Sequence, residues 1–211
     1  MPSTSTLIRF CATSIVLILL PGPGMLLLMA RGVASGRRVA ILSAFGVESG
    51  TVLYVCATAA GVGSLLARSA LAFSLVRYLG AAYLVVLGVR TLLDRAEPPL
   101  SHGREPMSAR RAYGQAFLVG STNPKIAIFF LAFFPQFVDP TRGSVALQVL
   151  VLGGVFVAMA LPIDLIVAAT AGRLGGWLSR RPSFARRQRY VAGSIYIALG
   201  ASAAASNPSR A

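Results

Sequence analysis

Long apolar stretches, separated by short polar gaps, run along the chain. A bilayer core roughly 30 Å thick takes about 20 helical residues to cross, so each stretch is suited to span a membrane once. We therefore expect an all-α membrane protein of about six transmembrane helices, near residues 7–30, 39–62, 70–91, 113–135, 145–171 and 190–206. The first stretch is too long for the core of a signal peptide, so we expect it to be retained as a helix.

The composition agrees with a protein that has lipid as its solvent. Of its 211 residues, 55% are hydrophobic and 12% are charged, and the mean hydropathy is +0.72, which is far more apolar than an ordinary soluble domain. A formal charge of +14 would suit a nucleic-acid-binding protein, but the arginines lie between apolar stretches rather than along one face. We expect the lipid bilayer as a partner, and no nucleic acid.

The arginines also predict an orientation. Fourteen of them lie in the first, third and fifth gaps, and five lie on the opposite side. Basic residues collect on the cytoplasmic side of membrane proteins. We therefore expect a multi-pass protein of the bacterial cytoplasmic membrane, with the odd-numbered gaps inside and both termini outside.

Residues 77–88 resemble residues 189–200, with the same spacing inside each segment. Each segment begins the third helix of a three-helix half. Because three is an odd number of crossings, two such halves insert upside down relative to each other, as in many secondary transporters. We expect one polytopic membrane domain made of repeat one (about 1–92), a cytoplasmic loop (about 93–112) and repeat two (about 113–206). The alternative is a chance similarity between two apolar helices.

Two proline motifs interrupt the first and fourth expected helices. Proline removes a backbone donor and breaks a helix, and in lipid the freed backbone groups are tolerated only beside protein or a water-filled cavity. Paired breaks in corresponding helices point to a transporter's substrate site, whereas a packing kink is the structural alternative. The freed N–H groups can hold a carboxylate and the freed carbonyls an ammonium, as a zwitterion requires. The expected substrate-binding residues are Pro21, Gly22, Pro23 and Gly24 in the first helix, and Asn123, Pro124 and Lys125 in the fourth.

Three ionisable residues fall near the middle of their expected spans, namely Glu48, Lys125 and Asp164. A charge at this depth costs at least about 2.5–3.5 kcal/mol, so such residues normally face the interior, pair with one another and serve function. Lys125 requires an acid, and either Glu48 or Asp164 is suited to pair with it while the other carries a proton. A purely structural ion pair is the alternative.

Several of these segments together resemble the lysine and homoserine exporter (LysE/RhtB) family, over nearly the whole chain. The resemblance rests on residues 21–23 with the arginines up to 38, residues 78–84, residues 114–140, and Asp164 with residues 171–174. It implies export of amino acids or their derivatives from the cytoplasm, driven by the proton gradient. Many members have an acid at the position of Thr51, and here Glu48 lies one turn away.

We therefore expect a secondary active transporter that exports amino acids or related small zwitterions, by proton antiport through Glu48 or Asp164. A channel and an intramembrane enzyme are the alternatives, but paired breaks favour alternating access and no suitable nucleophile and base lie together. No phosphate-binding glycine loop or His/Cys cluster occurs in the sequence, so we expect no cofactor, no metal and no catalytic residue. The identity of the substrate and any homo-oligomer remain open.

The orientation leads to a first prediction. Epitope tags inserted after Gly103 and after Arg181 should be cytoplasmic, and a tag after Arg210 should be external, because the odd-numbered gaps carry the arginine excess. Protease digestion of intact cells and of opened cells measures this. Cleavage of the tag after Gly103 from outside intact cells would contradict the orientation.

Overall fold

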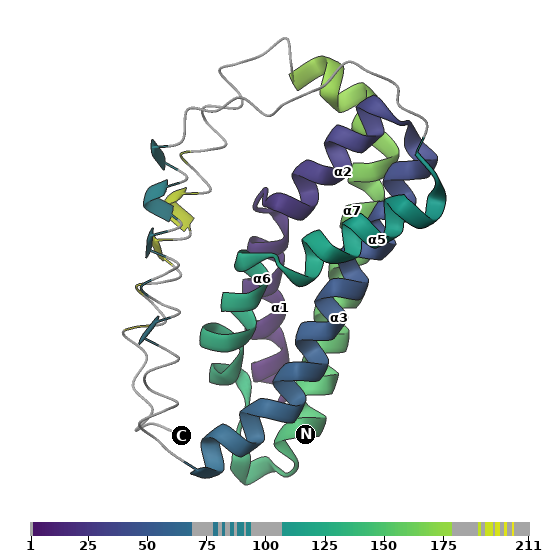
Figure 1. Cartoon of the computed structure of the whole chain (residues 1–211). Helices are drawn as coiled ribbons and strands as arrows, with labels where there is room; N and C mark the ends of the chain where they lie inside the picture. The colour runs from purple at the N-terminus through teal and green to yellow at the C-terminus, as the bar shows by residue number, and fades with distance from the viewer. Residues whose placement is uncertain are drawn as a thin grey trace.

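The computed structural model describes residues 2–68 and 107–178, together with scattered positions at 78–79, 82, 85–86, 88–90, 92–93, 190, 193–195, 197–198, 201 and 204. All regular secondary structure in this described part is helical (Figure 1). The elements are α1 (Thr4–Leu19), α2 (Pro23–Ala34), α3 (Arg37–Arg68), α5 (Ala109–Ser121), α6 (Pro124–Ile128), the π-helical turn η1 (Phe129–Phe133), the 3-10 turns η2 (Phe134–Phe137) and η3 (Pro140–Arg142), and α7 (Val145–Leu178).

Two of the described helices are long and apolar enough to cross a membrane, within Arg37–Gly61 of α3 and Val145–Gly172 of α7. The pair α1 and α2 passes the same test jointly, with a bend of 46° between them. The first, second and fifth expected helices are therefore present. The fourth is present as α5, α6, η1 and η2. The expected spans 70–91 and 190–206, the 93–112 loop and the similarity between residues 77–88 and 189–200 fall largely outside the described residues.

Both predicted helix breaks are present, and proline explains each of them. α1 ends at Leu19, and α2 begins with Pro23, whose missing N–H is harmless at the first helical position. In the same way, α5 ends at Ser121 and α6 begins with Pro124. Each break thus turns one expected membrane helix into two shorter helices.

α3 packs along both α5 and α7 (Figure 1). Glycines of both helices lie at the contact between α3 and α5. A Cβ atom added at Gly120 of α5 would overlap the carbonyl oxygen of Val47, and one at Gly50 would overlap the backbone N of Ser121. Gly46 and Gly50 of α3 are four residues apart, a spacing that lets helix backbones approach closely in membranes. The contact holds the α5–α6 break beside the middle of α3.

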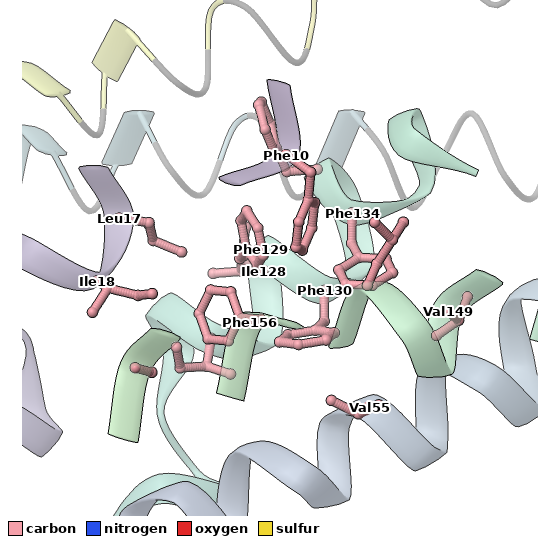
Figure 2. Close-up of a cluster of buried hydrophobic side chains, with 14 of the residues drawn as sticks. Phe10, Leu17, Ile18, Val55, Ile128, Phe129, Phe130, Phe134, Val149 and Phe156 are labelled. Atoms are coloured by element: carbon pink, nitrogen blue, oxygen red, sulfur yellow. The ribbon is translucent and has the colours of Figure 1, made fainter. Parts of the chain in front are cut away.

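Two clusters of buried side chains lie along the bundle. One is aromatic and joins α1 to η1, η2 and α7 (Figure 2). In it, the ring centroids of Phe130 and Phe134 are 4.8 Å apart and stacked, and Phe10 meets Phe134 edge to face at 5.3 Å. The other joins α2, α3, α5 and α7 mostly through small residues, namely Leu28, Ala40, Ala44, Val47, Ala116 and Ala168.

The glycine contact generates a second prediction. Gly120→Val should lower the thermal unfolding midpoint of the purified protein, because the added side chain pushes α5 away from the α3 backbone. Overpacking a tight contact costs about 1–3 kcal/mol, and here the clash is with backbone atoms that cannot rotate away. Gly114→Val is the matched control, since nothing lies within 4 Å of a Cβ at that position of the same helix. Equal midpoints for the two variants would contradict the assigned contact.

Candidate functional site

A small polar cavity lies where the two helix breaks meet α3 and α7. Its volume is about 30 Å³, which is room for one or two water molecules. Its lining is part polar and part apolar, and Ile18, Ile126 and Phe156 are among the apolar residues. The polar contributors are Glu48, Thr51, Asn123, Lys125 and Asp164, with Gly24 and Met25 at the start of α2.

The structure therefore brings together five of the nine residues expected to form the site. Gly24, Glu48, Asn123, Lys125 and Asp164 line one cavity, although they come from helices far apart in the sequence. The other four belong to the breaks themselves and shape the backbone around the cavity. They are Pro21, Gly22, Pro23 and Pro124.

Lys125 binds the end of the broken first helix. Its Nζ donates hydrogen bonds to the backbone oxygens of Leu20 (2.9 Å) and Leu17 (3.2 Å). The last carbonyls of a helix lack the regular partners of its interior and form the negative end of the helix dipole, and here the Leu17 carbonyl also accepts a hydrogen bond from the backbone N of Leu20 at 3.2 Å. The side chain reaches them across Gly22, where a Cβ atom would lie 3.2 Å from Lys125 Cε and 3.3 Å from Nζ. The lysine thus caps α1 where the chain leaves the helix.

This arrangement differs from the expected direct ion pair. Among the described residues, no carboxylate oxygen lies within 4.0 Å of the Lys125 ammonium. Both acids are nevertheless close enough to act on it electrostatically. Sequence reasoning gave Lys125 an acid as its partner because a buried charge needs compensation, but backbone carbonyls compensate much of it here.

Glu48 of α3 and Asp164 of α7 face each other in the same cavity. Each side chain is buried, with 7% of its residue exposed, and the two carboxyl groups are close enough to act on each other electrostatically. Glu48 Oε2 has no hydrogen-bond partner in the described structure. Buried polar atoms are nearly always satisfied, so this oxygen is available to a proton or a ligand.

Thr51 lies one turn beyond Glu48 and lines the same cavity. Its hydroxyl donates only a long bond, 3.4 Å, to the Val47 carbonyl of its own helix. Because residues three apart share a helix face, an acid at either position would reach the same space.

The two helices that begin at the breaks differ in how their first N–H groups are occupied. α6 has five residues, and the side chain of its cap, Asn123, accepts a hydrogen bond from the backbone N of Lys125 at 3.1 Å. α2 has twelve residues and no side-chain cap, and Gly24 and Met25 in its first turn line the cavity. The start of α2 is therefore the better place for a carboxylate.

Two further residues, whose contacts the sequence did not reveal, hold the elements around the cavity. Arg31 near the end of α2 is buried and donates to Ser43 Oγ (2.8 Å), to Gln115 Oε1 (2.8 Å) and to the Ala112 carbonyl, so it ties α2 to α3 and α5. Tyr54 of α3 donates from its hydroxyl to the carbonyl of Ser121, at the end of α5, at 2.7 Å. From the sequence, Arg31 contributed to the predicted orientation, as one of the arginines on the cytoplasmic side, and its contacts were not expected.

Comparisons with known proteins add a family relationship. The pattern of the LysE type translocator family matches residues 15–207. An uncharacterised membrane protein of Vibrio cholerae is 34% identical over 92% of this chain and 93% of its own. A homoserine/homoserine lactone efflux protein of Salmonella typhimurium is 31% identical over 91% of this chain and 92% of its own. No solved structure matches this chain.

The cap at the second break generates a third prediction. Asn123→Ala should lower the unfolding free energy by about 0.5–2 kcal/mol, because the first N–H groups of α6 lose a side-chain acceptor. Asn123→Ser is the matched control, since serine keeps such an acceptor. Thermal unfolding in detergent measures both variants. Equal loss in the two would show that the amide's other contacts, and not the cap, stabilise the break.

Proposed function

The chain belongs to the LysE type translocator family, and from that premise we propose that it exports small amino acids or related zwitterions from the bacterial cytoplasm as a secondary active transporter. The family consists of transporters, so the chain is a membrane transport protein and not an enzyme. One observation carries the proposal: two broken helices and three buried ionisable residues meet at one cavity.

We infer a six-helix architecture with two inverted repeats, about 1–92 and 113–206, and both termini outside the cytoplasmic membrane. The breaks support it, because each lies in the first helix of its half and each begins its second piece with proline. Breaks at corresponding positions of two halves are how many secondary transporters build a site near the membrane midplane.

The substrate class follows from the charges around the cavity. A carboxylate fits the uncapped start of α2, and an ammonium fits the carboxyl groups of Glu48 and Asp164 together with the end of α1. The name of the Salmonella relative refers to homoserine and to its lactone. Both compounds have a primary amine, which binds as the ammonium, but only homoserine has a free carboxylate. We therefore propose that the ammonium is the group that every substrate must have.

The cavity must widen before a substrate can bind. Ligand sites usually enclose about 300 Å³ or more, against about 30 Å³ here. α2 and α6 are the elements suited to move, because each is a short helix with a break at one end. In many secondary transporters, alternating access works by such movement of elements about a fixed binding site.

The carboxyl pair offers a physical basis for proton antiport. Two carboxyl groups that lie close together in a buried site favour holding one proton between them over carrying two charges. A substrate ammonium would favour the fully charged pair instead. Proton and substrate therefore compete for the same groups, so each crossing of the membrane carries one or the other, as an antiporter requires.

A fourth prediction tests this function. Purified protein in liposomes, loaded with unlabelled homoserine, should transiently accumulate labelled homoserine from outside, which a simple pore cannot do. With a pH gradient imposed, wild-type protein should also drive net transport. In Asp164→Asn, the gradient-driven transport should fall at least about tenfold while exchange persists, because the carboxyl pair has lost its titration.

Glu48→Gln is the matched control for the location of the proton. Loss of gradient-driven transport in both variants supports a shared pair, and loss in only one assigns the proton to that residue. Absence of both accumulation and exchange in the wild-type protein, with homoserine and with other amino acids, would contradict the proposed function.

A further inference from the structure

We propose that the Lys125 ammonium occupies the place of the substrate's own ammonium, so that a substrate binds by displacing it and then receives it as the partner of its carboxylate. This inference rests on the proposed function and assigns Lys125 a role in specificity. The observation behind it is the pair of hydrogen bonds from Lys125 Nζ to the Leu17 and Leu20 carbonyls.

The cation site at the end of α1 already holds a primary ammonium. Lys125 is buried, with 6% of the residue exposed, and it lies beside Glu48 and Asp164 without reaching either carboxylate within 4.0 Å. Its contacts are the ones a free amino acid's ammonium would seek here: two helix-terminal carbonyls and a nearby acid pair. The lysine side chain therefore holds, at the end of α1, the same ammonium group that a bound amino acid would place there.

The choice of lysine supports this reading. The sequence has twenty basic residues, of which nineteen are arginine, and Lys125 is its single lysine. An arginine has a planar guanidinium with five donors, whereas lysine and an amino acid share the same compact ammonium. At the one position where the chain must imitate a substrate ammonium, it has the matching group.

Glycine at position 22 is what lets the lysine reach this place. The Lys125 side chain passes directly over Gly22, with Cδ, Cε and Nζ at 3.4, 3.2 and 3.3 Å from where a Cβ would lie. A methyl group there would require the flexible end of the lysine to give way by a few tenths of an ångström, without changing any charge. Gly22→Ala is thus a way to weaken the contact between Lys125 and α1 while keeping the ammonium.

Displacement has a consequence for substrate preference. Once a substrate ammonium takes the α1 carbonyls, the Lys125 ammonium needs a new acceptor in a site without bulk water. A zwitterion supplies its carboxylate, and the uncapped first turn of α2 lies on the same cavity. A substrate that has only the ammonium, such as homoserine lactone, leaves Lys125 without that acceptor. Lys125 should therefore favour homoserine over its lactone.

The single lysine makes a direct test feasible. Protein grown with lysine labelled at Cε and placed in lipid nanodiscs should give one lysine NMR signal. Homoserine and its lactone should both shift this signal saturably, because both displace the ammonium from the carbonyls. Thermal stabilisation of the same sample reports binding independently. Binding of homoserine with no change in the lysine signal would overturn the displacement.

Variants test the preference. In Lys125→Met, the dissociation constant of the lactone relative to that of homoserine should fall at least about tenfold, since the loss or gain of one charged hydrogen bond is worth that much. Gly22→Ala should instead lower both dissociation constants and leave their ratio unchanged, because it weakens a contact that either substrate must displace, and it keeps the test valid if Lys125→Met does not fold. Lys125→Arg retains the charge, and Gly154→Ala, where a Cβ meets nothing within 4 Å, is matched to Gly22→Ala.

The outcomes separate the two proposals. If wild-type protein binds both compounds, while Lys125→Met leaves the ratio unchanged and Gly22→Ala lowers neither dissociation constant, the displacement is overturned and the transport function stands. If wild-type protein binds and exchanges neither these compounds nor other amino acids, the proposed function fails, and the role of Lys125 fails with it.

Discussion

A helix that is opened inside a membrane has no water to satisfy its backbone, and this constraint governs the site. The carbonyls at the end of α1 are satisfied by Lys125, and the carbonyl of Ser121 at the end of α5 is satisfied by Tyr54. The start of α6 is satisfied by Asn123. The partners of the broken backbone thus place the polar side chains around the cavity, and an unsatisfied start of α2 is left facing it.

Close helix packing brings these hydrogen-bonded helix ends together around one site. α3 carries Glu48 two residues from both Gly46 and Gly50, so along the helix axis the acid lies at the level of the contact between the α3 and α5 backbones. The α5–α6 break follows immediately and brings Lys125 to the same level. α7 completes the cavity with Asp164. The three ionisable groups share one small cavity, and their short separation strengthens every electrostatic interaction among them.

The sequence predicted those features of the site whose energetic cost can be recognised within a single segment of the chain. Proline cannot continue a helix and a charge cannot lie in lipid, so the breaks and the three buried ionisable residues stood out without any knowledge of the fold. The pairing of Lys125 with α1 carbonyls was not predictable, because it depends on how α6 lies against a helix about a hundred residues earlier. Arg31 was interpreted by its position in the chain alone, and its hydrogen bonds to α3 and α5 depend on packing that no local pattern encodes. Six helices and their inverted repeat remain predictions, since the third and sixth lie largely outside the described residues.

The glycines at the contact between α3 and α5 and the apolar residues that line the cavity differ in how easily they can be replaced. Gly46, Gly50 and Gly120 contribute no side chain, yet any replacement would force two backbones apart. The apolar residues that line the cavity, Ile18, Ile126 and Phe156, contribute side chains and not backbone, so a change there requires repacking of side chains and does not bring two backbones into contact. Descendants of one such scaffold can therefore diverge in the side chains they accept while the charged centre stays where it is.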